Sequence, residues 1–150
     1  MPGDITFRTA DEGDYAFAWE SYVAGIRAYT EDLMEWHEGR QSESFRRQWD
    51  SGKRAQIIVE GGTDVGWFQA AIHPSEIILQ QLFVVGERRG NGIGTAVLTH
   101  LIGAWKDEGK PIVLTVLRNN PAVRLYERLG FSVAGEEGVK YRMQRDLRSQ

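Results

Sequence analysis

A glycine-dense segment has the composition of an anion-binding loop. It follows an apolar run and precedes a long amphipathic stretch, and it consists of Arg88, Arg89, Gly90, Asn91, Gly92, Ile93, Gly94 and Thr95. Glycines leave main-chain N–H groups accessible, and the N-terminus of a following helix adds the positive end of its dipole. The two arginines supply full positive charges. The segment therefore predicts a phosphate-binding loop between a strand and a helix.

The residues at the end of this loop exclude two common phosphate-binding motifs. A P-loop requires lysine after its last glycine, whereas Thr95 follows Gly94. The dinucleotide fingerprint G-x-G-x-x-G requires glycine at the position of Thr95, together with repeated βαβ units. The pattern that remains is Arg89-x-x-Gly92-x-Gly94.

A second motif occupies residues 119–131. Its sequence is Asn-Asn-Pro-Ala-Val-Arg-Leu-Tyr-Glu-Arg-Leu-Gly-Phe. Together with Arg89-x-x-Gly92-x-Gly94, it resembles the two hallmark motifs of the GCN5-related N-acetyltransferase (GNAT) family, whose members bind coenzyme A. The order of the intervening elements also fits, so the resemblance covers essentially the whole chain.

The resemblance implies that the chain binds acetyl-coenzyme A as its acetyl donor. Residues 88–95 would hold the pyrophosphate through main-chain N–H groups. The strand that ends near residue 84 would diverge from a parallel neighbour at 112–117, with the pantetheine arm in the gap. Outside the loop, the implied contacts of the cosubstrate are Leu82, Phe83, Val84, Asn119, Ala122 and Tyr126.

Tyr126 is the candidate general acid. When an amine attacks the thioester, the leaving thiolate needs a proton or a hydrogen bond. A tyrosine, with a reference pKa of about 10, is a suitable donor to a thiolate whose conjugate acid has a pKa of about 8.5. The resemblance places this role on Tyr126. The alternative is an aromatic side chain that fills the helix–sheet interface beside Leu125 and Leu129.

No carboxylate stands where many family members keep a general base, because Gln80 occupies that strand position. An amide cannot accept the proton. Glu76 lies on the same strand face about 13 Å away, so it could serve only through waters. A tight turn at Pro74-Ser75 would place Gln69 opposite Gln80. Deprotonation at neutral pH costs about 4 kcal/mol for a lysine-type amine and about 1 kcal/mol for an α-amino group, so an acceptor of modest basicity is expected.

The residues that would bind the amine acceptor are less clearly indicated by the sequence than those that would bind acetyl-coenzyme A. Helices in the first third of the chain carry aromatic side chains with carboxylates between them, which suits a cationic amine. The alternative is that the aromatic side chains are core and the charges a solvated face. The residues concerned are Tyr15, Trp19, Tyr22, Tyr29, Asp32, Glu35, Trp36, His37, Glu38 and Trp49.

These residues require an alternating set of strands and helices to position them. Hydrophobic periodicity and turn residues predict the elements. The expected strands are 5–8, 55–60, 64–72, 76–85, 112–117, 131–136 and 139–145, and the expected helices are 11–27, 30–51, 93–109 and 121–129. The fold class is α/β (α+β). The resemblance implies a GNAT fold, with a mixed sheet of about seven strands, a splayed parallel pair and about four flanking helices.

Composition narrows the class of protein. A length of 150 residues predicts a single domain, and a net charge of −3 argues against a general nucleic-acid binder. The absence of cysteine excludes a cysteine nucleophile, and no apolar run has the length of a membrane span. No metal site is predicted, because His37, His73 and His100 are scattered. A cytoplasmic location is expected.

The sequence therefore predicts an acetyl-coenzyme A-dependent N-acetyltransferase. A primary amine would attack directly in a ternary complex, the acceptor being a small molecule or a peptide or protein N-terminus. The alternative is a non-catalytic module of the same fold that senses acyl-coenzyme A. The resemblance leaves homodimerisation open.

Overall fold

The computed structural model describes residues 3–30, 37–51, 54–86 and 92–146. All the expected strands and helices are present, and most bounds differ from the predicted ones by a few residues. The helix expected at 30–51 is described over Glu38–Trp49, and the predicted acceptor-side residues Asp32, Glu35 and Trp36 lie outside the described residues. In chain order the elements are β1 (Ile5–Thr9), η1 (Glu12–Asp14), α1 (Tyr15–Thr30), α2 (Glu38–Trp49), β2 (Gln56–Glu60), β3 (Thr63–Ile72), β4 (Ile77–Val84), α3 (Ile93–Trp105), η3 (Lys106–Glu108), β5 (Ile112–Leu117), α4 (Ala122–Arg128), β6 (Ser132–Glu137) and β7 (Lys140–Arg145).

The strands form one seven-stranded mixed sheet in the order β1-β2-β3-β4-β5-β7-β6. The pair β4–β5 is parallel, and its register joins Ile77 to Ile112 and Ile78 to Val113. The pairs β1–β2, β2–β3, β5–β7 and β6–β7 are antiparallel. This is the mixed sheet with a parallel pair that the resemblance implied.

The chain divides into two compact units. One comprises Met1–Gln69 with Gln81–Gly94, and the other comprises Ala70–Gln80 with Thr95–Gln150. Each unit has its own buried hydrophobic residues.

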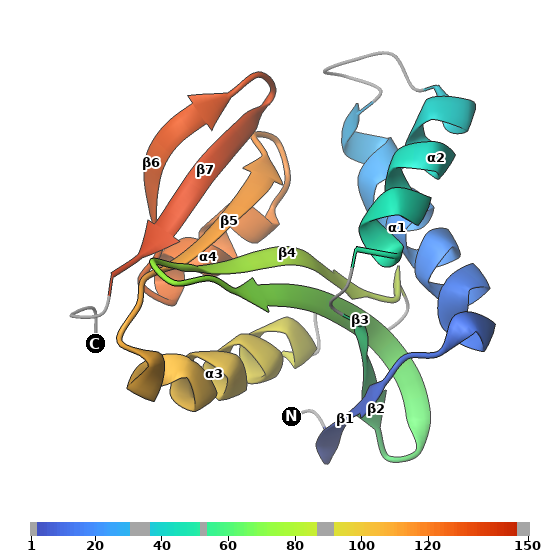
Figure 1. Ribbon diagram of the computed structural model, residues 1–150, viewed down its shortest axis with the longest axis horizontal. Helices are drawn as coiled ribbons and strands as arrows, with labels where there is room; N and C mark the ends of the chain where they lie inside the picture. The colour runs from blue at the N-terminus through green and yellow to red at the C-terminus, as the bar shows by residue number, and fades with distance from the viewer. Residues whose placement is uncertain (1–2, 31–36, 52–53, 87–91, 147–150) are drawn as a thin grey trace. The chain divides into compact units, whose positions relative to one another are not determined.

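The first unit has an aromatic core between its helices and strands. Figure 1 shows α1 and α2 side by side, in blue and teal. Phe45 of α2 and Trp67 of β3 are buried, with ring centroids 5.7 Å apart in an edge-on arrangement. The other aromatic side chains of this core are Tyr15, Phe17, Trp19, Tyr22, Trp49 and Phe83. Tyr15, Trp19, Tyr22 and Trp49 are therefore core residues, as the alternative interpretation of the aromatic stripe expected.

A capping box and a two-glycine turn stabilise two local structures of this unit. Asp11 and Asp14 form a capping box ahead of α1, with the Asp11 carboxylate accepting the N–H of Gly13 at 2.8 Å. Gly61 and Gly62, with φ of +55° and +86°, make the tight turn between β2 and β3. A two-glycine turn of this kind matches the twist of the strands that it joins.

The second unit is built on β5, which is buried along most of its length. Leu114 of β5 lies opposite the fully buried Met143 of β7. Figure 1 shows β6 and β7 as the red hairpin beside β5. The helix α3 buries an apolar stripe that includes Val97, Leu98 and Leu101, and its final 3-10 turn ends at Gly109, where φ is +69°.

Across the described part of the chain, no helix combines the length and the apolar character needed to cross a membrane.

Candidate active site

The second half of the predicted phosphate loop, from Gly92 onward, lies within the described residues. Arg88, Arg89, Gly90 and Asn91 lie outside the described residues. Gly92 has a φ of +79°, a left-handed conformation that favours glycine, and α3 begins at the next residue. Ile93 is buried, Gly94 follows it and Thr95 is exposed in the first helical turn. The main-chain N–H groups of this turn have no acceptor within the helix itself, so the turn has the donors that an anion requires.

The last residues of β4 are half-buried and make contacts to the aromatic core. The ring of Phe83 lies 5.4 Å from that of Trp67 and 5.6 Å from that of Tyr22, measured between centroids. The N–H of Val85 donates to the carbonyl of Val65 at 2.8 Å. The segment Leu82–Val84, to which the resemblance assigned the pantetheine arm, is therefore held against β3 by both side chain and main chain.

Tyr126 lies on the short helix α4, which follows β5 closely. Its side chain is buried, with a relative exposure of 8%, and its ring contacts Phe131 edge-on at 5.8 Å. Burial raises the pKa of Tyr126 to about 12. The phenol is therefore protonated throughout the physiological pH range. Asn119 is exposed immediately before α4, and Ala122 is the first residue of that helix.

Asn120 is a residue of this site that the sequence analysis missed. Its Oδ1 accepts a hydrogen bond from the N–H of Ala122 at 2.9 Å, so it satisfies one of the unpaired N–H groups at the start of α4. The signal was present, because asparagine followed by proline is a common beginning of a helix. The family motif drew attention to Asn119 instead.

The side chain at the strand position where the resemblance expects a general base is the amide of Gln80. Gln80 lies on β4, and its Oε1 is buried with no hydrogen-bond partner within the described residues. Glu76 precedes β4 in a tight turn closed by the N–H of His73 and the carbonyl of Glu76 at 2.8 Å. Its Oε1 lies 3.6 Å from Nη2 of Arg142, and both side chains are about one-third exposed. The carboxylate of Glu76 is therefore held beside β7.

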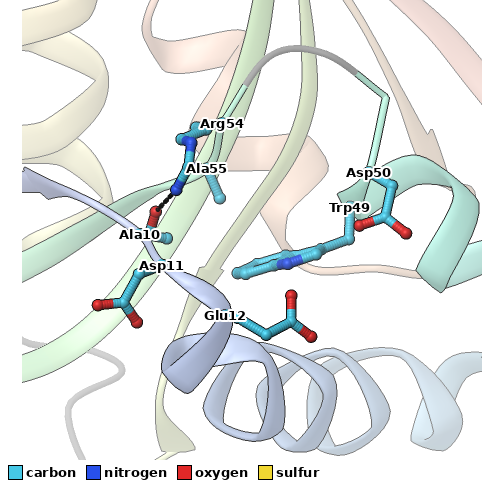
Figure 2. A pocket seen from close by; sticks show the side chains of 7 residues that line it. All are labelled: Ala10, Asp11, Glu12, Trp49, Asp50, Arg54 and Ala55. Atoms are coloured by element: carbon cyan, nitrogen blue, oxygen red, sulfur yellow. Dashed lines mark hydrogen bonds between the residues drawn. The ribbon is translucent and has the colours of Figure 1, made fainter.

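A separate pocket of about 270 Å³ lies beside η1 and the C-terminal end of α2 (Figure 2). Arg54 donates to the carbonyl of Ala10 at 2.9 Å. Two carboxylates of the pocket, those of Glu12 and Asp50, bind Arg46 at 2.9 Å each. Of the residues predicted for the acceptor side, Trp49 lines this pocket, and the carboxylates of Glu12 and Asp50 already pair with Arg46. Figure 2 shows Trp49 as its apolar wall. Nor do the described residues gather three side chains that could hold a metal ion.

Comparison with known proteins identifies the family to which this chain belongs. The model of the acetyltransferase (GNAT) family matches residues 15–131. The chain belongs to this family, as the two motifs predicted.

Three similar proteins illustrate the relationship. A mycothiol acetyltransferase of Corynebacterium aurimucosum is 32% identical over 135 residues, which cover 83% of this chain and 42% of that protein. The chain thus spans less than half the length of that relative. Two solved structures have the same fold. PaiA N-acetyltransferase from Thermoplasma acidophilum in complex with coenzyme A has a TM-score of 0.74 at 19% identity, covering 95% of this chain and 99% of that one. The ribosomal-protein-S18-alanine N-acetyltransferase of Escherichia coli has a TM-score of 0.71 at 20% identity, covering 96% and 94%.

Proposed function

We propose that this chain transfers the acetyl group of acetyl-coenzyme A to a primary amine of a small molecule, directly and in a ternary complex. The observation that carries the proposal is Tyr126. It occupies the family's position for the thiolate partner, it is buried on α4, and its burial keeps the hydroxyl protonated. A residue that only filled space would not need a hydroxyl group.

Two segments supply the cosubstrate site in this proposal. The pyrophosphate binds to main-chain N–H groups of the loop and the first turn of α3, supported by the positive φ of Gly92. The pantetheine arm pairs with the main chain at the end of β4 in this proposal, and the family motif assigns Asn119 and Ala122 to the same ligand. The residues proposed for these contacts are Arg88, Arg89, Gly90, Asn91, Gly92, Ile93, Gly94, Thr95, Leu82, Phe83, Val84, Asn119 and Ala122.

The chemical step exchanges one acyl bond for another. The amine nitrogen attacks the thioester carbonyl carbon, the C–S bond breaks, and the sulfur leaves as a thiolate while the nitrogen loses a proton. The pKa of Tyr126 is about 12, and that of a thiol is about 8.5. Complete proton transfer to the thiolate is therefore uphill by about 5 kcal/mol. The predicted general-acid role narrows to a hydrogen bond that stabilises the departing sulfur.

The proton of the attacking amine goes to water in this proposal. Gln80 cannot take it, because a side-chain amide does not act as a base. Glu76 stays a candidate for a water-relayed base. A direct carboxylate base is absent at the position of Gln80, so an acceptor of modest basicity is favoured over a lysine-like one.

The choice of a small-molecule acceptor follows from the degree of similarity. The relative at 32% identity is named a mycothiol acetyltransferase. The ribosomal-protein-S18-alanine N-acetyltransferase, whose name gives a protein acceptor, is only 20% identical. This chain is more similar to the mycothiol acetyltransferase, and we therefore propose a small-molecule acceptor for it as well.

Thiol release tests the proposal. The protein is incubated with acetyl-coenzyme A and a panel of amino acids, polyamines, aminoglycosides and peptides with free N-termini, and Tyr126→Phe is the matched control. We expect turnover with a small amine and a large loss of turnover in the variant. Turnover with peptides alone would contradict the acceptor class. Binding of acetyl-coenzyme A with no turnover on any amine would favour the sensing module.

A further inference from the structure

We propose that Gly66 of β3 is a positioning residue for the cosubstrate, because it permits the main-chain conformation of Phe83 and Val84 that binds acetyl-coenzyme A. The inference rests on the proposed function, which assigns Leu82–Val84 to that ligand. Gly66 lies outside both sequence motifs, and none of the patterns in the sequence singles it out.

The main chain of β4 fills the space that a side chain at Gly66 would need. A methyl group built on Gly66 would overlap the carbonyl oxygen of Phe83, and it would lie 3.1 Å from both the Phe83 carbonyl carbon and the Cα of Val84. All three are main-chain atoms, so no rotation of a side chain relieves the overlap. Protein interiors have no spare volume at such a contact. Gly66 is not among the glycines with positive φ, so the requirement for glycine comes from close approach alone.

The strand β3 cannot move aside to make room. On its other edge β3 pairs with β2, and this register joins Gly66 to Ile58 and Trp67 to Ile57. Both isoleucines and Trp67 have a relative exposure of 0%. A shift of β3 would disturb this buried layer, whereas Phe83 and Val84 are only partly buried. A larger residue at position 66 would therefore displace the main chain at Phe83 and Val84.

Neighbouring contacts hold the same part of β4 before any ligand binds. The N–H of Val85 donates to the carbonyl of Val65 at 2.8 Å. The ring of Phe83 packs on that of Trp67, with centroids 5.4 Å apart. Gly66 stands between these two contacts and brings the Phe83 carbonyl against β3. Three consecutive residues of β3 thus preorganise the segment, and preorganisation lowers the ordering cost of binding.

The chain offers a matched pair of variants for the test. Gly135 is also a strand glycine, on β6, but a methyl group built there meets no atom within 4 Å. We expect Gly66→Ala to raise the KM for acetyl-coenzyme A and the Kd for coenzyme A at least about tenfold, since small misplacements of binding groups have effects of this size or larger. The KM for the amine should change less than about twofold, and Gly135→Ala should leave both cosubstrate constants unchanged.

The outcomes separate this inference from the proposed function. A wild-type protein that does not bind coenzyme A would overturn both. Wild-type binding together with an unchanged Kd in folded Gly66→Ala, verified by circular dichroism, would overturn the inference alone. Should Gly66→Ala fail to fold, hydrogen exchange on the wild-type protein decides. The Val85 amide should be protected without coenzyme A, and protection that arises only on adding coenzyme A would refute the preorganised segment.

Discussion

Asn120 and Ala122 are joined by a 2.9 Å hydrogen bond from the main-chain N–H of Ala122 to Oδ1 of Asn120. The bond lies at the first turn of α4, the seven-residue helix that carries Tyr126. A helix this short is marginal by itself, because nucleation is costly and few hydrogen bonds follow. The cap therefore stabilises the helix that sets the position of the phenol.

Replacement of Asn120 by alanine should destabilise the protein by about 1 kcal/mol, the usual effect of losing a side-chain cap. We also expect a lower kcat with a smaller change in the KM for acetyl-coenzyme A, because Tyr126 loses its fixed orientation. Urea unfolding and thiol release measure the two effects. Asn120→Asp keeps an oxygen acceptor and should retain both properties. Equal losses in the alanine and aspartate variants would contradict the capping role.

Replacement of Tyr126 by phenylalanine should lower kcat about 100-fold, the typical effect of removing one donor to a developing negative charge. The ring contact with Phe131 is retained, so stability and the KM for acetyl-coenzyme A should change little. Since burial raises the pKa of Tyr126 to about 12, its ionisation should not produce a falling limb in the pH–rate profile below about pH 11. A limb near pH 10 that vanishes in the variant would argue against this assignment.

The value of kcat/KM should rise with pH according to the pKa of the acceptor amine. This follows because Gln80 cannot act as a base and Glu76 is held beside Arg142. Glu76→Gln should therefore keep the shape of the profile. An enzyme pKa near 6 that is present in the wild type and absent from Glu76→Gln would show that this carboxylate accepts the proton after all.

The stability of the protein should fall in acid partly through Asp14. The guanidinium of Arg8 donates to its carboxylate at 2.8 Å and lowers the pKa of Asp14 below its usual 3.8. A depressed pKa contributes stability that is complete above the unfolded-state value and is lost as the pH falls through the folded-state value. As the pH falls from 5 to 2, the free energy of unfolding of Asp14→Asn should decrease by about 1 kcal/mol less than that of the wild type. Thermal unfolding at each pH measures this difference. The exposed Asp107→Asn serves as the control and should follow the wild type.

Replacement of Arg89 by glutamate should raise the KM for acetyl-coenzyme A much more than the KM for the amine. The change reverses a charge in the segment proposed to hold the pyrophosphate, where interactions between charged groups are strong. Lys106→Glu reverses a charge of the same sign at the other end of α3 and should have little effect. Equal KM values for acetyl-coenzyme A in Arg89→Glu and Lys106→Glu would refute the phosphate role of Arg89.

The elements of the fold were predictable from local patterns. Alternation and β-branched content located the strands, and the pair Gly61-Gly62 located a hairpin whose positive φ values the structure contains. Gly109 was likewise predictable as the end of the helical segment that α3 and η3 form, because glycine is the residue that most readily adopts the left-handed conformation after a helix. Sequence patterns left the function of the aromatic stripe undecided, because helical spacing is the same for a core and for a binding wall. Contacts across the first unit, such as Tyr15 to Trp49 at 5.6 Å, identified it as core.

The amino-acid sequence alone determined the family of this chain, through the segments 88–95 and 119–131. Each of these motifs is a short run of residues, so it can be recognised without the tertiary structure. Only the tertiary structure decided which other residues position these two segments and the end of β4, and how burial affects them. The cap of Asn120 depends on the turn ahead of α4, the pKa of Tyr126 depends on burial, and the need for glycine at Gly66 depends on a carbonyl 17 positions away in the chain, that of Phe83. Close approach between strands is a property of packed main chains, and no pattern within a single strand records it.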